Sequence, residues 1–226
     1  MVIHKQKTFE EILDSLKGEK KVFIAGCADC STSCKVGGEE ELADIKKKLE
    51  EKGFTVTGTH VFDTACQDGE IRKKYALYKQ AIDEADSILV MTCGIGVQAI
   101  GDLIGKRVHT GADTLFIGEV IHMGKYQEKC SACGKCVLEY TDGICPVTRC
   151  AKGLLNGPCG GYTKDGKCEV DPDRECAWLQ IYNRLKERGE LEKIKKYHEP
   201  RKFSAKPKAG IYKFPKPEKP PKKEAI

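Results

Sequence analysis

Thirteen cysteines are the residues of this 226-residue chain with the clearest capacity for chemistry. Five lie in the first half of the chain, at Cys27, Cys30, Cys34, Cys66 and Cys93. The other eight follow as a second set, at Cys130, Cys133, Cys136, Cys145, Cys150, Cys159, Cys168 and Cys176. Thiolates at short spacings hold structural zinc or iron–sulfur clusters, so we expect both sets to be metal ligands.

The second set begins with the spacing Cys130-x2-Cys133-x2-Cys136, which matches the start of a bacterial ferredoxin run. In that run the next cysteine, followed by proline, comes after about three residues, whereas Cys145-Pro146 follows here after a longer gap. Eight cysteines fit two 4Fe–4S clusters, or one cluster and one zinc site, and the sequence leaves this choice open. The close spacing of three ligands favours iron–sulfur over zinc, which usually takes its cysteines in two pairs.

The first set offers five candidates for the four ligands of one cluster or zinc site. Cys27, Cys30 and Cys34 are spaced closely enough to act together, with either Cys66 or Cys93 as the fourth ligand. The alternative for the last two is that they are ordinary buried cysteines. The order C-x2-C-x3-C differs from the run of radical enzymes that use S-adenosylmethionine, which argues against that class.

Two glycines that follow Cys93, Gly94 and Gly96, are candidates for contact with a bound cofactor. They indicate dinucleotide binding only weakly, because they follow the third predicted strand and their spacing departs from G-x-G-x-x-G. We favour a tight turn that lets the backbone approach a cluster.

Short apolar runs alternate with amphipathic segments in the first half of the chain, which predicts a parallel sheet with crossover helices. The predicted strands are residues 21–26, 54–62, 87–91 and 114–118. The predicted helices are residues 8–17, 37–53, 68–85 and 97–104. The fold class is therefore α/β, with a small doubly wound, mostly parallel sheet. Since parallel strands end at one edge of a sheet, the cysteines that follow three of them are expected to converge there.

The sequence divides into three parts. Residues 1–125 form the α/β domain. Residues 126–199 form a loop-rich, ferredoxin-like iron–sulfur segment that closes with a helix over 175–188, whose apolar stripe is Trp178, Ile181, Tyr182 and Leu185, and a short helix over 190–197. Residues 200–226 form a Lys/Pro-rich tail, and we favour an extended arm on a partner, anchored by Tyr212 and Phe214, over a disordered segment.

Composition limits the class of protein further. Hydrophobic residues make up 40% and charged residues 32% of the chain, which is typical of a soluble globular protein. There is no apolar run long enough for a membrane span and no apolar core of a secretory signal, so a cytoplasmic location is expected. Thiols stay reduced there, and the odd number of cysteines also argues against a disulfide framework.

The net charge of +5 belongs to the tail. Nine Lys or Arg and two Glu give residues 200–226 a charge of +7, which leaves about −2 on residues 1–199. A nucleic-acid partner is therefore not expected.

Four stretches carry a resemblance to a known family: GCADCSTSCKVGGEEE, MTCGIGVQ, CSACGKCVLEYTDGICPVTRCAKGLLNGPCGG and GKCEVDPDRECAWLQIYNRL. Because of these stretches, residues 26–185 resemble the iron–sulfur partner subunit of bacterial methylenetetrahydrofolate reductase. This subunit family is also called the methylenetetrahydrofolate reductase C-terminal-like domain family. The resemblance implies an electron-transfer subunit in the methyl branch of anaerobic one-carbon metabolism, the Wood–Ljungdahl pathway.

The same resemblance implies the cofactors and partners. Two or three 4Fe–4S clusters are expected on this chain, with one zinc ion as an alternative to one of them. The flavin is expected on a catalytic (β/α)8 partner that reduces methylenetetrahydrofolate to methyltetrahydrofolate. The electron donor would be a ferredoxin, a nicotinamide-oxidising subunit, a hydrogenase or a module similar to heterodisulfide reductase.

The chain itself shows no catalytic constellation. It has no Ser-His-Asp arrangement and no phosphate loop, and its histidines, His4, His60, His109, His122 and His198, are scattered. This pattern favours a non-catalytic subunit of an oxidoreductase complex, in which the organic chemistry belongs to the partner's flavin. The alternative is a zinc-stabilised scaffold or adaptor that docks the reductase to another complex.

Overall fold

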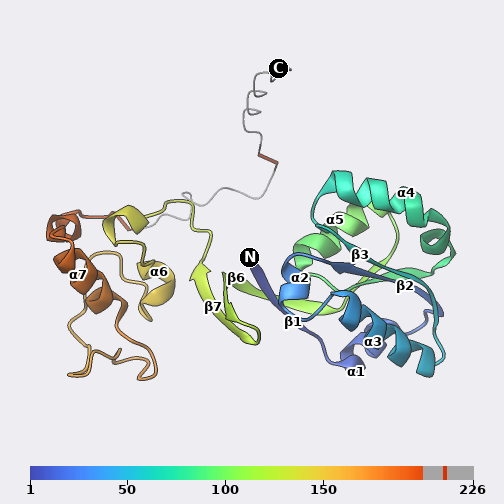
Figure 1. The fold of residues 1–226 in the computed structure, drawn as a ribbon, viewed down its shortest axis with the longest axis horizontal. Helices are drawn as coiled ribbons and strands as arrows, with labels where there is room; N and C mark the ends of the chain where they lie inside the picture. The colour runs from blue at the N-terminus through green and yellow to red at the C-terminus, as the bar shows by residue number, and fades with distance from the viewer. Residues whose placement is uncertain (201–210, 213–226) are drawn as a thin grey trace, which may run out of the picture.

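The alternation of apolar and amphipathic segments folds into a parallel four-stranded sheet with helices on both faces (Figure 1). The structure is a computed structural model that describes residues 1–200 and 211–212. The strands of this sheet are β2 (Lys21–Cys27), β3 (Thr55–Phe62), β4 (Ser87–Val90) and β5 (Val108–Thr110). The helices between them are α2 (Cys30–Ser33), α3 (Glu39–Glu51), α4 (Asp68–Glu84) and α5 (Gly94–Ile104).

The strand order is β3-β2-β4-β5, and all neighbouring pairs are parallel. The chain moves outward from β2 to β3 and then crosses back to place β4 on the other side of β2. This strand order confirms the expected α/β class. The winding direction reverses at the gap between β2 and β4, and folds of this kind bind their ligands at such a point.

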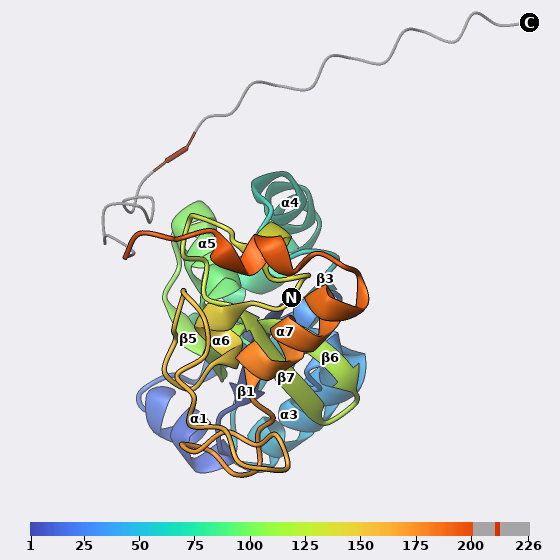
Figure 2. The ribbon, with the colours of Figure 1, turned by 90° about the vertical axis from the view of Figure 1, so that its left-hand side faces the viewer.

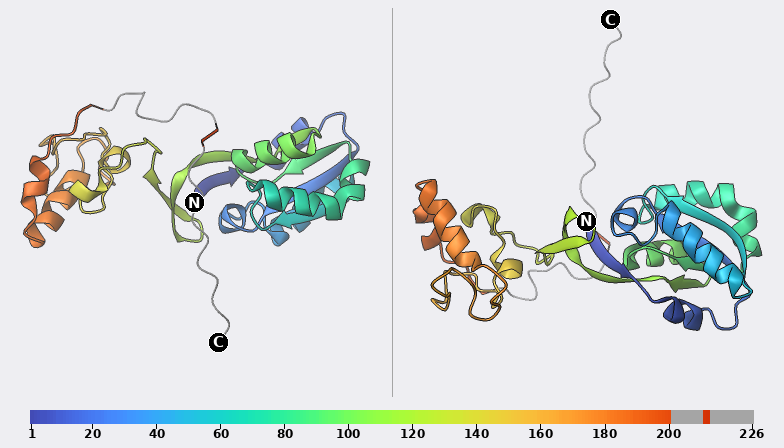
Figure 3. Two further views of the ribbon diagram at one scale, coloured as in Figure 1. Left: turned by 90° about the horizontal axis from the view of Figure 1, so that it is seen from above. Right: turned by 60° about the horizontal axis from the view of Figure 1, so that its bottom comes forward.

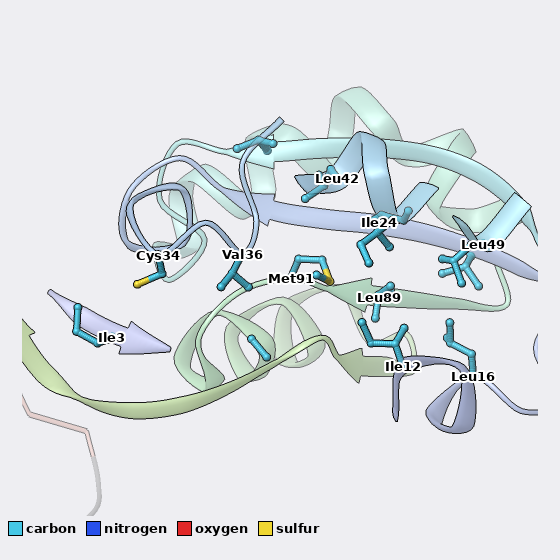
Figure 4. Packing of buried hydrophobic residues seen from close by; sticks show 14 residues of the cluster. Ile3, Ile12, Leu16, Ile24, Cys34, Val36, Leu42, Leu49, Leu89 and Met91 are labelled. Atoms are coloured by element: carbon cyan, nitrogen blue, oxygen red, sulfur yellow. The ribbon is translucent and has the colours of Figure 1, made fainter. Parts of the chain in front are cut away.

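Side chains of the central strand β2 alternate between two cores. One core packs against α3 and α1 (Phe9–Ser15) and includes Ile24, Leu42 and Leu89, as Figure 4 shows. The other core packs against α4 and α5 and includes Phe23 and Ile100. Because both faces of the sheet are covered, β2 is buried from its second residue to its end, as its apolar sequence requires.

A second sheet is antiparallel, has the order β1-β6-β7, and was not expected. Its strands are β1 (Val2–Gln6), β6 (Ala112–His122) and β7 (Lys125–Cys130). The predicted strand over 114–118 lies in β6, so its expected place as the fourth parallel strand was wrong; β5 holds that place. The physical reason is the alternation of β6: Phe116 and Val120 pack on the core, whereas Leu115 and Ile121 are exposed, which suits a sheet covered on one side.

Beyond β7 the chain forms a cysteine-rich lobe, residues 131–200. The α/β lobe is residues 1–122, and its strand β6 pairs with β7. Figures 1 and 3 show β6 and β7 between the cysteine-rich lobe and the parallel sheet with its helices. Figure 2 shows that much of the cysteine-rich lobe is loop. Its regular elements are η1 (Leu138–Tyr140), α6 (Pro146–Arg149), α7 (Ala177–Glu187) and η2 (Leu191–Lys195).

A small cluster of buried side chains holds the cysteine-rich lobe, comprising Ile144, Ala177, Trp178, Ile181 and Leu185. The helix predicted over 175–188 is confirmed, with one correction. Tyr182 was expected in its apolar stripe but is 42% exposed, because the stripe that faces the lobe runs through Trp178, Ile181 and Leu185.

The predicted tail arm, with Phe214, lies outside the described residues, apart from Ile211 and Tyr212, both of which are exposed. Among the described helices, not one has the length and apolar character that crossing a membrane requires.

Candidate metal centres

The first cysteine set lies at the carboxyl edge of the parallel sheet, where three strands end. Cys27 is the last residue of β2, Cys66 follows β3, and Cys93 follows β4 as the N-cap of α5. Cys30 begins the short helix α2, and Cys34 caps its end. Cys27 and Cys93 therefore flank the point between β2 and β4 where the strand order reverses.

Three of these thiols are nearly sealed from solvent: the exposed fractions are 7% for Cys27 and 8% for both Cys34 and Cys93. Cys30 is half-buried and Cys66 is exposed. The set is thus a mostly buried group of thiols with one member at the surface.

The thiols of the first set are close enough to act on one another electrostatically. Burial raises the pKa of Cys30, Cys34 and Cys66, and the charge of a Cys93 thiolate raises the pKa of each further. Cys27 acts in the same direction on Cys30 and Cys66. The mutual repulsion means that the set favours a bound cation or cationic cluster once its members ionise.

Strand β1 completes this site from outside the parallel sheet. Hydrogen bonds from the backbone of Val2 to Cys30 and from the backbone of His4 to Cys34 favour the thiolate forms and lower the pKa of each thiol, against the larger effect of burial. The His4 ring is 2% exposed, and its Nε2 lies 3.0 Å from Oγ of Ser31 in α2. The five residues of β1 contain no motif that predicts this role.

Two glycines allow the loop after α2 to pack across the strand ends. A Cβ on Gly37 would lie 1.9 Å from the carbonyl oxygen of Met91, and one on Gly26 would lie 2.2 Å from the carbonyl oxygen of Gly37. The Cys27 amide donates to that same Gly37 oxygen at 2.9 Å. The loop that carries Cys34 is therefore fixed by backbone contacts that leave no room for a side chain.

The glycines predicted to approach a cofactor lie in the first turn of α5. The Gly94 amide donates to Oγ1 of Thr114 on β6 at 2.8 Å. A Cβ on Gly96 would lie 2.5 Å from Oγ1 of Thr92, so this position allows α5 to start close to the end of β4. In this structure both glycines serve packing beside Cys93, and their contact with a cofactor stays a prediction.

Four members of the second set line one pocket in the cysteine-rich lobe: Cys150, Cys159, Cys168 and Cys176. Cys150 caps the end of α6 and Cys176 caps the start of α7, so two helix ends converge there. Trp178 also lines the pocket, is 4% exposed, and donates from Nε1 to the Leu154 carbonyl oxygen at 2.9 Å.

Polar groups surround this pocket. The Gly161 amide donates to Sγ of Cys159 at 3.4 Å. The Cys159 thiol lies 3.7 Å from Oε1 of Glu169, which also forms an ion pair with Lys152. The Lys152 side chain holds the pKa of the Glu169 carboxyl below its ordinary value, which keeps that carboxylate charged beside the thiols.

The other four cysteines of the second set lie between the end of β7 and the start of α6. Cys130 is the last residue of β7, Cys145 is the N-cap of α6, and Cys133 and Cys136 lie in the loop between them. The Ala132 amide donates to Sγ of Cys130 at 3.3 Å. Ala132 has a φ of +51°, an uncommon conformation for a residue with a side chain, and it turns this amide back towards the sulfur.

Contact between α6 and β7 brings the two ends of this segment together. Oγ1 of Thr148 donates to the Lys129 carbonyl oxygen at 3.2 Å. Cys145 and Cys150 flank the single turn of α6, and Cys150 is one of the cysteines that line the pocket. A helix of four residues is about 6 Å long. Cys145 and Cys150 therefore lie at opposite ends of α6, and the end of β7, with Cys130, packs against this helix.

No disulfide joins any of the thirteen cysteines, all of which lie within the part of the chain that the structure describes. Within residues 1–200 and 211–212, no group of three or more His, Cys, Asp or Glu side chains has the arrangement needed to hold a metal ion. The structure thus gathers thiols at the strand edge and in the pocket without bringing them to the close mutual distances of a single-ion site.

Comparison with known families places the second half of the chain. Residues 109–204 match a family model described as "Methylene-tetrahydrofolate reductase C terminal". This part of the chain is similar to the C-terminal region that the family model describes. A search of curated proteins gave no match.

The region matched to the methylenetetrahydrofolate reductase family runs from β5 to just beyond η2. It contains strands β6 and β7 and the entire second cysteine set, including the pocket at α7. The first set, from Cys27 to Cys93, lies outside the matched residues.

The surroundings of the first cysteine set favour thiols that act as metal ligands over thiols that act as nucleophiles. A reactive cysteine needs a neighbouring base or cation that lowers its pKa, whereas burial raises the pKa of Cys30, Cys34 and Cys66. The donor set fits an iron–sulfur cluster or zinc, both of which stabilise thiolates directly.

Proposed function

We propose that this chain is the electron-transfer subunit of a methylenetetrahydrofolate reductase complex. It passes single electrons to the flavin of a catalytic partner that reduces methylenetetrahydrofolate to methyltetrahydrofolate. The match over residues 109–204 supports a place in such a complex. The two cysteine sets support electron transfer as the task.

The observation that carries this proposal is the pocket lined by Cys150, Cys159, Cys168 and Cys176. Four thiolates are the number that holds one 4Fe–4S cluster, and such a cluster accepts and releases single electrons when bound. The Gly161 amide hydrogen-bonds to Sγ of Cys159. Hydrogen bonds of this kind stabilise charge on the ligand sulfur and so adjust the potential.

The segment from Cys130 to Cys145 and the first set supply further ligands. In the first set, backbone hydrogen bonds from β1 to Cys30 and Cys34 favour the thiolate forms that ligation requires. Four cysteines ligate one 4Fe–4S cluster, so the thirteen cysteines of the two sets supply enough ligands for up to three clusters. Two or three clusters on this chain are therefore proposed.

Analysis of iron and acid-labile sulfide in anaerobically prepared full-length protein tests the proposal. We expect a brown protein that contains both, with visible absorbance that bleaches on addition of dithionite. A colourless protein that contains zinc alone would overturn electron transfer. Co-purification with a flavin protein, followed by reduction of that flavin through this chain, tests the proposed place in the reductase.

A zinc-stabilised scaffold or adaptor is the second candidate. It is favoured by the small buried cluster of the cysteine-rich lobe, which needs a further source of stability. In that case the protein would contain zinc, show no visible absorbance, and still bind the reductase. The same metal analysis therefore separates the two candidates.

A further inference from the structure

We propose that the antiparallel sheet β1-β6-β7 is the bridge by which electrons pass between the first and the second cysteine set. This inference rests on the proposed function, because it requires a redox centre at each set. To that function it adds a route for the electrons through the strands β1, β6 and β7.

The first end of the bridge is β1. Sγ of Cys34 lies 4.0 Å from the carbonyl oxygen of Val2, and the backbone of Val2 also hydrogen-bonds to Cys30. The backbone of His4 hydrogen-bonds to Cys34. Cys34 therefore contacts the main chain of β1 directly, and the backbone of Val2 also lowers the pKa of Cys30.

The second end of the bridge is reached by crossing two strands. Val2 on β1 is paired with Ile117 on β6, and Ile117 is paired with Cys130 on β7. Neighbouring strands are separated by about 4.8 Å, so Cys130 lies roughly 10 Å from Val2 along this line. One row of the sheet thus leads from the main chain that touches Cys30 and Cys34 to the first cysteine of the second set.

Hydrogen bonds hold this row together. Beside the pair of Val2 and Ile117, the Met1 nitrogen donates to the Gly118 oxygen at 3.0 Å, and the Gly118 amide donates to the Met1 oxygen at 3.0 Å. Between β6 and β7, Nζ of Lys129 lies 2.9 Å from Oε1 of Glu119. Hydrogen bonds and an ion pair therefore join the three strands beside this row.

Two side chains attach the same sheet to the first set at other points. Tyr126 on β7 donates from its hydroxyl to the Ser33 carbonyl oxygen at 3.1 Å, next to Cys34. Thr114 on β6 accepts from the Gly94 amide, next to Cys93. The sheet consequently contacts the surroundings of three thiols of the first set, and β7 ends in Cys130.

The transfer is a single-electron exchange between the sets. A reduced centre at one set loses one electron and an oxidised centre at the other gains it, with no bond made or broken and no proton moved by this chain. Dithionite, a one-electron reductant, supplies the electrons in the test.

Gly118 offers a way to loosen the bridge without changing a cysteine. A Cβ at this position would lie 2.2 Å from the Gln127 carbonyl oxygen on β7, so Gly118→Ala must push β7 away from β6. Gly69→Ala in α4 is the matched control, because a Cβ there meets nothing within 4 Å. Both variants add one methyl group to the full-length chain.

The experiment is rapid-freeze EPR of the full-length, iron-loaded protein after a substoichiometric pulse of dithionite. Cys30→Ser and Cys133→Ser variants assign the signals of the first and second sets. We expect wild type and Gly69→Ala to show fast equilibration and spin–spin broadening between the sets. In Gly118→Ala, equilibration should slow several-fold and the broadening weaken, with the iron content unchanged.

An unchanged equilibration rate in iron-replete Gly118→Ala would overturn the bridge while leaving the proposed function standing. Absence of iron from wild type would instead overturn the proposed function. If Gly118→Ala loses its iron, Tyr126→Phe decides, since it removes only the hydroxyl bond to Ser33. Slower equilibration in Tyr126→Phe supports the bridge, and an unchanged rate overturns it.

Discussion

The thiols of the first set differ in how well the structure prepares them for ligation. Cys93 is 8% exposed and raises the pKa of Cys30, Cys34 and Cys66 alike, so it lies near the centre of the set. Cys66 is exposed. The sequence alone offered either as the fourth ligand beside Cys27, Cys30 and Cys34, and we propose Cys93 because it is the buried one of the two.

We therefore predict that Cys93→Ser loses the iron of the first set and that Cys66→Ser retains it. Serine is a preferred N-cap residue, so Cys93→Ser should leave the start of α5 intact and remove only the thiolate. Iron and sulfide content, with EPR to identify the remaining centre, measures the outcome. Equal iron loss in the two variants would show that both cysteines are needed.

Gly37 is the residue on which the position of Cys34 depends most closely. A methyl group there would collide with the Met91 main chain at the end of β4. Gly37→Ala should therefore lower the free energy of unfolding by about 3 kcal/mol, the upper range for overpacking. Urea unfolding followed by circular dichroism measures this, with Gly69→Ala as the control. If the two variants unfolded at the same urea concentration, the close contact at Gly37 would make no measurable contribution to the free energy of unfolding.

Among the elements, those with a local signature were predictable. The Thr8 and Glu11 capping box that sets the start of α1 is present, with the Thr8 amide donating to Glu11 at 2.8 Å. The apolar period of α7 was also visible, although the sequence could not show that Tyr182 lies just outside the buried stripe. In each case residues within one or two helical turns carry the information.

Elements that depend on distant partners were missed. The strand β1 pairs with β6, more than 100 residues later, and its five residues show no pattern that identifies this partner. The three residues of β5 are too few to show a period, so its place was assigned to β6. The sequence predicted that thiols converge at the strand edge, but the part of β1 in that site depends on pairing that local residues do not encode.

At the scale of one element, α7 determines the stability of the cysteine-rich lobe. It supplies Ala177, Trp178, Ile181 and Leu185 to the buried cluster of that lobe. We predict that Ile181→Ala lowers the free energy of unfolding of the lobe by about 3 kcal/mol, through lost burial and the cavity left behind.

Tyr182→Ala is the matched control, because Tyr182 is adjacent on α7 but 42% exposed. Trp178 is the sole tryptophan and lies within the cluster, so its fluorescence during urea unfolding reports this lobe specifically. A larger effect from Tyr182→Ala than from Ile181→Ala would mean that the helix is held through its outer face.

At the scale of the whole molecule, stability is unevenly divided between the two lobes. The α/β lobe has two extensive buried clusters on the faces of its parallel sheet, whereas the cysteine-rich lobe has one small cluster and long loops (Figure 2). The cysteine-rich lobe contains seven thiols, and Cys130 lies directly before it at the end of β7. Metal ligation can supply folding free energy in such a segment, because the site does not exist in the unfolded chain.

Removal of metal from the full-length protein should therefore unfold the cysteine-rich lobe and leave the α/β lobe folded. After treatment with a chelator and an oxidant, Trp178 fluorescence should shift towards that of solvent-exposed tryptophan, while most of the helical circular dichroism remains, since α1, α3, α4 and α5 lie in the α/β lobe. Limited proteolysis should then cut after β7 and leave a resistant fragment that contains the parallel sheet. Simultaneous loss of both signals would mean that the lobes fold as one cooperative unit, whereas unchanged fluorescence would mean that the small apolar cluster is sufficient to hold the cysteine-rich lobe without metal.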